Sequence, residues 1–491
     1  MCARVLDGRR DPAAVPAPDR AADVRLTGGH DMIRILPILL ALVLPVVSHA
    51  AQPAPVSPAD TDAALIKRGE YLARAGDCMA CHTAKHGQPF AGGLPLQTPM
   101  GRIYATNITP DRDTGIGTWT YADFSTLMRT GRAKEGYTVY PAMPYPSYSR
   151  IGDSDMHALY AYFQHGVAPV HQVNRPSDIP WPLSMRWPLT IWAWLFAPKP
   201  EPFSPPLGSQ PSITLGRYLV EGLGHCGSCH TARGVALQET ALTDDASHRF
   251  LDGGGAIDGW IAPSLRGDRP DGIGAWSEND IVAFLKTGRN ANTASFGAMN
   301  DVIVNSTQHL SDVDLHSIAR YLKTLAPHRR DVPYARDETI SAALAHQQVA
   351  SEGAQIYLDR CAGCHRSNGQ GAGVAFPALA GNPVLQTADP TSAIHIVLAG
   401  GRQPATATAP SAFTMGPLNT VLDDRQVAAV VSFVQTAWGN QGGPATVKQV
   451  AKIRADSEAA EGKAPVVAQP QLHHAAPVNR ASGPSAGVSG G

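Results

Sequence analysis

Three copies of one short cysteine pattern constrain this chain more than any other feature. The pattern Cys-x-x-Cys-His occurs as CMACH at residues 78–82, CGSCH at 226–230 and CAGCH at 361–365. Two thiols three residues apart on one helical turn reach both vinyl groups of one porphyrin, and the next histidine points at the iron. We therefore predict three covalently bound haem c groups, attached through Cys78, Cys81, Cys226, Cys229, Cys361 and Cys364, with His82, His230 and His365 as axial iron ligands.

Disulfide bonds and zinc sites are the two other interpretations of these six cysteines. Disulfides are common in exported proteins, and closely spaced cysteines can hold zinc. The seventh cysteine, Cys2, lies in a segment that we expect to be absent from the mature protein. Three matching signatures with no unpaired cysteine left over favour haem attachment over both alternatives.

The signatures belong to a longer repeat. Their first cysteines are 148 and 135 residues apart. A glycine starts a short amphipathic helix before each signature, at Gly69, Gly216 and Gly353. A middle helix follows at 119–132, 276–289 and 389–402, and a last helix at 152–163, 311–322 and 423–434. This periodicity predicts an all-α fold of three tandem cytochrome c domains joined by Pro-rich linkers.

The last helix of each repeat carries two features at fixed positions. An aspartate near its start is of the N-cap type, at Asp153, Asp312 and Asp424. An aromatic residue near its end is expected to pack against the first helix of its own domain, at Tyr162, Tyr321 and Phe433. We interpret these aromatics as core residues.

A methionine in register supplies the candidate sixth iron ligand of each haem. These methionines lie 11, 10 and 13 residues past the Gly-Arg end of the middle helix, at Met143, Met299 and Met415. Methionine opposite histidine raises the haem potential and suits electron transfer. Helical register assigns Met128 and Met156 to the core, and Met100 remains the alternative to Met143.

Proline-containing loops lie between each signature and its middle helix, at 105–111, 262–268 and 376–383. We expect a backbone carbonyl in each loop to accept a hydrogen bond from the histidine Nδ1–H, as is usual for metal-ligating histidines. The alternative for Asn107, Pro263 and Pro377 is plain loop structure.

The N-terminal residues 1–50 are typical of a leader. An apolar run from Ile35 to Val47 follows Met32 and Arg34, and small residues end at Ala50. This is the pattern of a secretory signal peptide, and its run of about 13 residues is short of the about 20 that span a membrane. We interpret residues 1–31 as a doubtful extension and predict a periplasmic protein. The formal charge of -1 argues against a nucleic-acid partner.

Three further motifs give the chain a family resemblance over residues 61–440. They are TNITPD at 106–111, YPAMPY at 140–145 and MRWPL at 185–189. With the three signatures, they resemble the triheme cytochrome c subunit of membrane-bound periplasmic alcohol, gluconate, sorbitol, fructose and aldehyde dehydrogenases. The third domain departs from the pattern where ADPTSAIHIV replaces the Trp-led helix start.

The resemblance implies a division of labour. A separate large subunit, a quinoprotein, flavoprotein or molybdoprotein, oxidises the substrate, and this chain passes the electrons to ubiquinone at the outer face of the cytoplasmic membrane. No catalytic residues are expected on this chain, since GGG at 253–255 lacks the context of a dinucleotide site. Two alternatives are a freestanding periplasmic carrier serving a terminal oxidase and a multihaem peroxidase, which would need a haem without its distal methionine.

A tryptophan-rich stretch, WPLSMRWPLTIWAWLF at 181–196, stands out in the predicted linker 167–207. We predict a short helix from Pro188 to Phe196, too short to cross a bilayer. Tryptophan favours the membrane–water interface, so this segment is expected to lie on the membrane, with Arg186 and Lys199 near headgroups. Packing against the dehydrogenase subunit or the chain's own domains are the alternatives.

The predicted boundaries follow from these motifs. The three cytochrome c domains span 61–166, 208–328 and 346–440, and residues 445–491 form a disordered tail rich in Ala, Pro, Gly and Ser.

Overall fold

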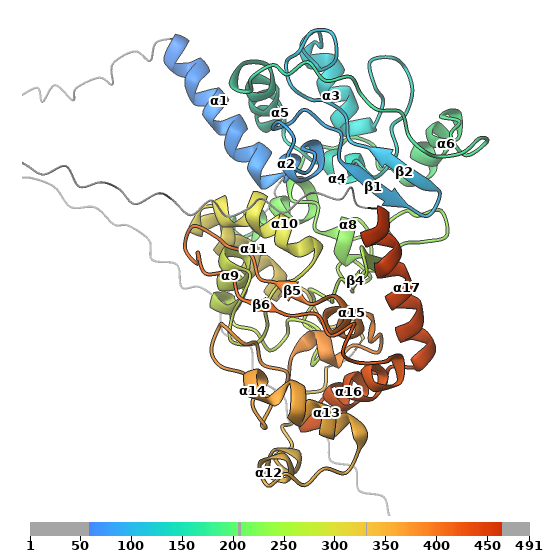
Figure 1. The fold of residues 1–491 in the computed structure, drawn as a ribbon. Helices are drawn as coiled ribbons and strands as arrows, with labels where there is room; N and C mark the ends of the chain where they lie inside the picture. Colours follow the sequence, from blue (N-terminus) through green and yellow to red (C-terminus); the bar gives the residue numbers. More distant parts are fainter. Residues whose placement is uncertain (1–57, 205–207, 330, 464–491) are drawn as a thin grey trace, which may run out of the picture. The chain divides into compact units, whose positions relative to one another are not determined.

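The computed structural model describes residues 58–204, 208–329 and 331–463 (Figure 1). We call these ranges the first, second and third lobe. The predicted signal peptide and its cleavage after Ala50 lie outside the described residues. The described chain is mostly helical, with three short antiparallel hairpins. None of the helices in the described ranges is long and apolar enough to cross a membrane.

Each lobe is built on one pair of packed helices. The pairs are α1 (Pro58–Ala75) with α5 (Asp153–Ala161), α7 (Pro211–Tyr218) with α11 (Asp312–Thr324), and α13 (Glu352–Arg360) with α16 (Asp424–Thr436). These are the predicted first and last helices of each repeat. In the first two lobes a π-helical turn prolongs one member of the pair, η1 (Tyr162–Gly166) after α5 and η2 (Leu219–Leu223) after α7.

A glycine lies where each helix pair crosses. A Cβ atom would be 1.9 Å from a backbone carbonyl oxygen of the partner helix at Gly69 and Gly216, and 2.2 Å at Gly353. Gly353 lies at the start of its helix, as the sequence predicted, whereas Gly69 and Gly216 lie well inside theirs. All three glycines permit the helices to approach closely. The other residue close to each crossing is the predicted aromatic, since the Cβ atoms of Tyr162, Tyr321 and Phe433 would lie 2.6, 2.8 and 2.9 Å from the added atom; this confirms that each aromatic packs against the first helix of its own lobe.

The last helices begin one residue earlier than the aspartate pattern suggested. Their N-caps are Gly152, Ser311 and Asp423, so Asp153, Asp312 and Asp424 are first-turn residues. Ser311 accepts a hydrogen bond from the Asp314 amide, because a side chain at the N-cap is the one that reaches the third helical N–H. A first-turn aspartate still interacts favourably with the positive end of the helix dipole.

The middle helices are α3 (Tyr121–Thr130), α9 (Glu278–Thr287) and α15 (Thr391–Ala399). The first two start in capping boxes, Thr120 with Asp123 and Ser277 with Asp280, and end at a left-handed glycine. Helix α15 follows Pro390 and has no side-chain cap. The third repeat therefore departs from the other two where its sequence does.

The first two lobes contact each other through reciprocal pairs. The Tyr71 hydroxyl of the first lobe donates to Asp314 of the second. The equivalent Tyr218 of the second lobe donates to the equivalent Asp155 of the first, at 2.8 Å. One hydrophobic core runs through both lobes, and a second core lies within the third. The third lobe has glutamines at the corresponding places, Gln355 and Gln426.

The predicted linker 167–207 is packed against the first lobe over part of its length. The Asn107 side-chain amide donates to the Val170 carbonyl at 2.8 Å, and the Asp178 amide donates to the Arg102 carbonyl at 2.8 Å. Helix α6 (Trp187–Phe196) follows, with proline in its first turn as predicted.

The disorder prediction is wrong for residues 447–463. They form α17 (Val447–Lys463), which packs on α15 and α16. Val450 is fully buried, and Arg454 pairs with Asp424 at 2.7 Å. The disorder prediction rested on the average composition of the whole tail, which does not represent its first part, the helix-forming stretch VKQVAKIRADSEAAEGK. The predicted disorder of residues 464–491 falls outside the described part of the chain.

The remaining elements are short. The helices are α2 (Cys78–His82), α4 (Tyr145–Tyr148), α8 (Gly227–His230), α10 (Ala298–Asn305), α12 (Thr339–Ala345) and α14 (Ala362–His365). The hairpins are β1 (Pro95–Thr98) with β2 (Gly101–Tyr104), β3 (Ala256–Ile257) with β4 (Trp260–Ile261), and β5 (Gly401–Arg402) with β6 (Thr414–Met415).

Candidate haem sites

The three signature histidines make the same hydrogen bond. Each lies at the end of a short helix, α2, α8 or α14. Their Nδ1 atoms lie 2.7, 2.8 and 2.9 Å from the carbonyl oxygens of Thr106, Pro263 and Pro377 respectively. The predicted bonds from the proline loops are confirmed, with Thr106 rather than Asn107 as the acceptor in the first lobe. Because a carbonyl only accepts, Nδ1 carries the proton and Nε2 keeps a free lone pair.

The histidines are held in the neutral form that binds iron. Burial lowers the pKa of His82, His230 and His365, and the bond to the carbonyl opposes this effect without cancelling it. A neutral ring whose other nitrogen is fixed presents its lone pair in one direction. This is the requirement for an axial metal ligand.

Four of the six signature cysteines have the properties of thiols rather than thiolates. Burial raises the pKa of Cys78 and Cys226 to about 12, and that of Cys81 and Cys361 to about 11. Zinc binding and disulfide exchange require the thiolate. All six described cysteines are free, and no group of three or more His, Cys, Asp or Glu in the described ranges could hold a metal ion by itself. The donors therefore fit thioether attachment of a porphyrin.

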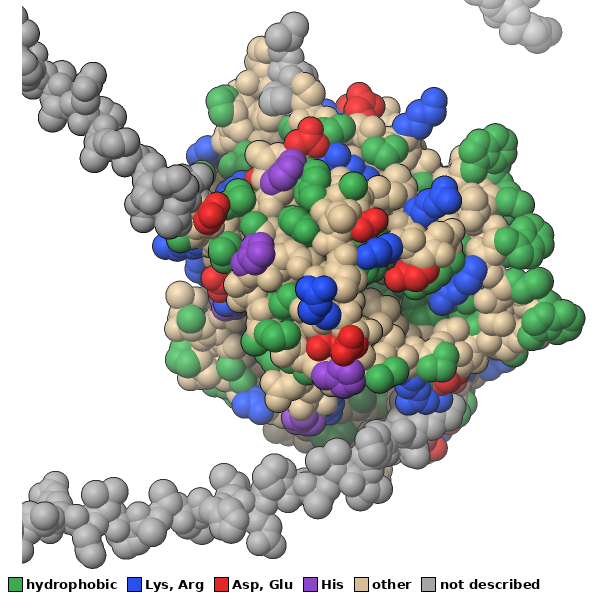
Figure 2. Space-filling model, turned by 90° about the horizontal axis from the view of Figure 1, so that it is seen from above, with side chains coloured by type: hydrophobic (Ala, Val, Ile, Leu, Met, Phe, Trp, Pro, Cys, Tyr) green, Lys and Arg blue, Asp and Glu red, His purple; other side chains and the backbone are tan. Residues whose placement is uncertain are grey.

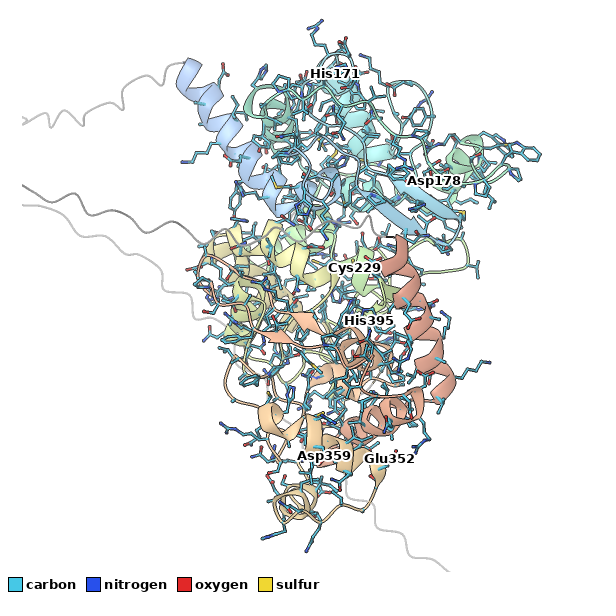
Figure 3. All side chains as sticks on the ribbon, in the orientation of Figure 1. His171, Asp178, Cys229, Glu352, Asp359 and His395 are labelled. Carbon is cyan, nitrogen blue, oxygen red and sulfur yellow. The ribbon has the colours of Figure 1, made fainter. Side chains whose placement is uncertain are left out.

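The second and third sites open into one apolar cavity of about 620 Å³. Its walls include both signatures and both candidate methionines of these lobes, namely Cys226, Cys229, His230, Met299, Cys361, Cys364, His365 and Met415. Figure 3 labels one residue on each of two bordering elements, Cys229 on α8 and His395 on α15. Large flat apolar groups fit this space, because its lining is mostly aliphatic and aromatic.

The cavity also reaches the first lobe. Ala75 and Asp77, just before the first signature, are among its lining residues. Burial raises the pKa of Asp77 to about 8, and the charge of Asp301 adds to the effect. Asp77 carries no signal in the sequence other than its position next to Cys78. The cavity thus reaches the residues that directly precede the first signature.

Met143 and Met100 occupy different environments in the first lobe. Met143 packs against the large core that Cys78 and Met79 also contact. Met100 packs instead in a small separate cluster with Ile103, Tyr140 and Ile179. Met128 and Met156 are buried in the core, as predicted. This arrangement favours Met143 over Met100 as the residue available to the first site.

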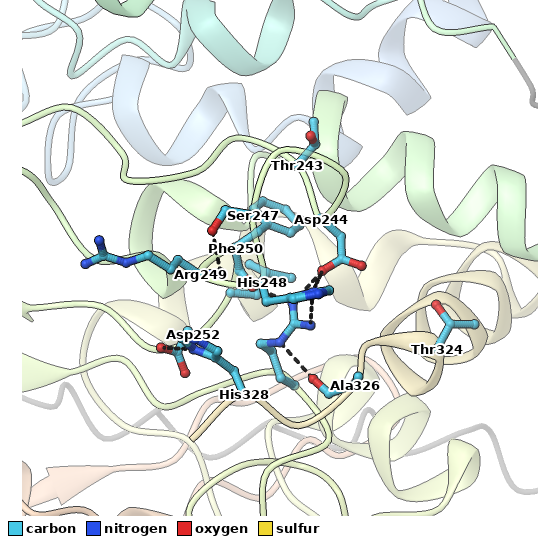
Figure 4. A network of polar contacts seen from close by, with 12 residues as sticks. Thr243, Asp244, Ser247, His248, Arg249, Phe250, Asp252, Thr324, Ala326 and His328 are labelled. Carbon is cyan, nitrogen blue, oxygen red and sulfur yellow. Dashed lines mark hydrogen bonds and ion pairs between the residues drawn. The ribbon is translucent and has the colours of Figure 1, made fainter. Parts of the chain in front are cut away.

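A buried arginine, missed by the sequence analysis, supports the loop that carries Pro263. The Arg266 side chain is fully buried, and its guanidinium contacts Asp244 at 2.7 Å. It also donates to the carbonyls of Phe250 at 3.0 Å and Ala326 at 2.9 Å. Figure 4 shows these partners lying on two separate stretches of the second lobe, one around Asp244 and Phe250 and one around Ala326. The network fixes the loop whose carbonyl orients His230.

Replacing Arg266 by methionine is expected to destabilise the second lobe by about 1–3 kcal/mol, because it leaves the buried Phe250 carbonyl and the part-exposed Asp244 carboxylate without their donor. The measurement is chemical unfolding of the purified protein, followed by circular dichroism. Arg320→Met is the matched control: Arg320 is 48% exposed and pairs with an exposed Glu278, so its loss should change stability by less than about 1 kcal/mol. Equal effects of the two substitutions would contradict the assigned role.

Comparison with known proteins shows the family of the chain. A cytochrome c family profile matches residues 66–166 and 350–438. The chain is 53% identical over 435 residues to the gluconate 2-dehydrogenase cytochrome c subunit of Pantoea cypripedii, covering 87% of this chain and 98% of that protein. It is 51% identical to the alcohol dehydrogenase (quinone) cytochrome c subunit of Gluconacetobacter polyoxogenes, covering 80% of this chain and 85% of the relative.

A more distant relative extends the pattern. The fructose dehydrogenase cytochrome subunit of Gluconobacter japonicus is 34% identical, with 84% of this chain and 87% of the relative covered. Together with the repeated histidine–carbonyl geometry, these matches lead to one conclusion. The chain belongs to the family of cytochrome c subunits of gluconate, alcohol and fructose dehydrogenases.

Proposed function

We propose that this chain is a triheme c-type electron-transfer subunit with three tandem cytochrome c domains. In this proposal the thiols of the three signatures hold the haems covalently. The axial pairs are His82 with Met143, His230 with Met299, and His365 with Met415. The chain carries electrons from a dehydrogenase subunit to membrane ubiquinone.

One observation carries the proposal: the same histidine–carbonyl bond recurs in all three lobes, each time beside a Cys-x-x-Cys-His helix. Haem supplies an iron that takes up and releases one electron. The protein's part is to fix the axial ligands, keep water from the ring and set the potential through burial and hydrogen bonding. A wall of aliphatic and aromatic side chains around the shared cavity serves the second of these tasks.

The partner and the electron acceptor are inferred from the relatives. Their names make them subunits of gluconate, alcohol and fructose dehydrogenases, and one is described as a quinone enzyme. In this proposal a separate large subunit, a quinoprotein, flavoprotein or molybdoprotein, oxidises the substrate. This chain then acts between that subunit and ubiquinone.

An exposed apolar face on and around α6 supports attachment to the outer face of the cytoplasmic membrane. Helix α6 turns Trp192 inward, where its ring N–H donates to the Ala236 carbonyl of the second lobe at 2.8 Å and the ring packs edge-to-face with Tyr145 of the first. The opposite side is solvent-exposed and consists of Trp181, Leu183, Trp187, Ile191, Trp194 and Leu195. Figure 2 shows hydrophobic side chains gathered on the side where Figure 1 places α6. Rings of this kind favour the membrane–water interface.

The two charged residues that flank the apolar face, Arg186 and Lys199, lie in different environments. The Arg186 guanidinium lies over the Tyr140 ring at 4.0 Å, so it is held by the first lobe rather than free to meet headgroups. Lys199 is exposed and keeps that role in the proposal.

The test is purification of the protein from detergent-extracted membranes, with the covalent haem per chain measured and the co-purifying proteins identified. We expect three haems per chain and a large subunit that contains quinone, flavin or molybdenum cofactor. A cytochrome released alone by salt would favour the freestanding carrier. Reduced protein that binds carbon monoxide strongly would favour the peroxidase.

A further inference from the structure

An arginine of the second lobe reaches into the third. Arg289 follows Gly288, the left-handed residue that ends α9, and is only 6% exposed. Its guanidinium donates to the Gln403 side-chain oxygen at 2.8 Å and to the carbonyls of Ser411 at 2.9 Å and Ala409 at 3.3 Å. It also lies over the Phe413 ring, 5.3 Å from the ring centre.

These acceptors all belong to the loop 403–413, which hairpin β5–β6 closes. In that hairpin Gly401 pairs with Met415 and Arg402 with Thr414. The Gln403 amide donates to the Phe413 carbonyl at 2.9 Å, which continues the ladder into the loop. Met415 therefore stands two residues beyond the ring on which Arg289 rests. Gln403, Phe413 and Met415 all line the shared cavity.

We propose that Arg289 is a positioning residue for Met415, the distal ligand of the third haem, so that one lobe sets the ligation of the next. This inference rests on the function proposed above. A guanidinium presents its donors in a rigid planar fork, and here it spans three acceptors on both sides of the loop. Held in this way, the loop keeps the thioether of Met415 directed into the cavity.

Arg289 differs from the arginines at the equivalent positions of the other two repeats. Arg132 and Arg402 end the middle segments of the other two lobes, and both are exposed. A second contact between the lobes supports the same loop: the Asn300 side-chain amide donates to the Arg402 carbonyl at 2.9 Å. Asn300 is the neighbour of Met299, the candidate ligand of the second site. The methionine regions of the two sites are thus joined across the lobe boundary.

The experiment measures carbon monoxide binding to the reduced, purified holo-cytochrome, together with the methionine-to-ferric-iron absorption band. Wild-type protein is expected to bind little. In Arg289→Met, about one haem in three should become accessible to carbon monoxide, since its methionine ligand is no longer held. Arg132→Met is the matched control and should behave as wild type. Covalent haem content and circular dichroism establish that each variant is folded.

Two further variants distinguish the ligand assignment of Met415 from the positioning role of Arg289. Met415→Ala should bind carbon monoxide at one haem; if it does not, the ligand assignment within the proposed function fails. If Met415→Ala does bind but Arg289→Met does not, the positioning role alone is overturned. Should Arg289→Met lose its haem, Arg289→Lys decides: it keeps the charge without the fork and should bind more carbon monoxide than wild type, and wild-type behaviour would overturn the proposal.

Discussion

Gly353→Ala is expected to disrupt the third lobe, although alanine is the better helix former by about 1 kcal/mol. The new methyl group would lie 2.2 Å from the Ala429 carbonyl oxygen and 2.9 Å from the Phe433 Cβ. Both belong to α16, so relief requires the two central helices of the lobe to separate. Overpacking of this kind costs about 1–3 kcal/mol or more. We expect a lower unfolding midpoint and a loss of haem from the third site, measured by denaturation and by covalent haem content.

Gly363→Ala is the control in the same lobe. A Cβ at Gly363 meets nothing within 4 Å, and the first signature already has an alanine, Ala80, at the corresponding place. This variant should retain three haems and wild-type stability. Wild-type behaviour of Gly353→Ala would show that the crossing tolerates a side chain, and would contradict the close approach of α13 and α16.

Replacing Trp181, Trp187 and Trp194 together by serine is expected to abolish binding of the purified cytochrome to lipid vesicles. The three side chains are 80%, 63% and 81% exposed. Half-burying each ring removes about 100 Å² from water, so together they should stabilise attachment by about 7–8 kcal/mol. Their loss would reduce the partition coefficient more than about 1000-fold. Flotation with phosphatidylethanolamine–phosphatidylglycerol vesicles measures it.

Trp192 must be left unchanged in this experiment. Trp192 is packed beneath the face, edge-to-face with Tyr145 at 6.3 Å, and its removal would loosen α6 itself. Serine replacement of Val313, Val374 and Val421, which are exposed elsewhere, is the control and should leave vesicle binding unchanged. Vesicle binding that survives in the tryptophan variant would assign the face to the dehydrogenase subunit instead.

The local features of the fold were predictable because they repeat. Comparison of the three copies of the repeat predicted the helix pairs, the aromatic at each crossing and the loops that bind the histidines. A feature present in one copy gave no such signal. Arg266 and Arg289 look like ordinary surface arginines in the sequence, and only tertiary contacts bury them. Helix α17 was not predicted, for a related reason. Its polar composition resembles that of the residues after it, and it is buried only because Val450 packs into the core formed by earlier residues of the third lobe.

The reciprocal contacts between the first two lobes have the form of a symmetric interface. Tyr71 meets Asp314, and the equivalent Tyr218 meets the equivalent Asp155. A self-complementary contact, in which residue i meets j and j meets i, is what two-fold symmetric homodimers make. The first two lobes therefore meet in the way that the two copies of such a dimer meet, although they belong to one chain. The third lobe has glutamine at both positions and contacts the second lobe through Arg289 and Asn300 instead.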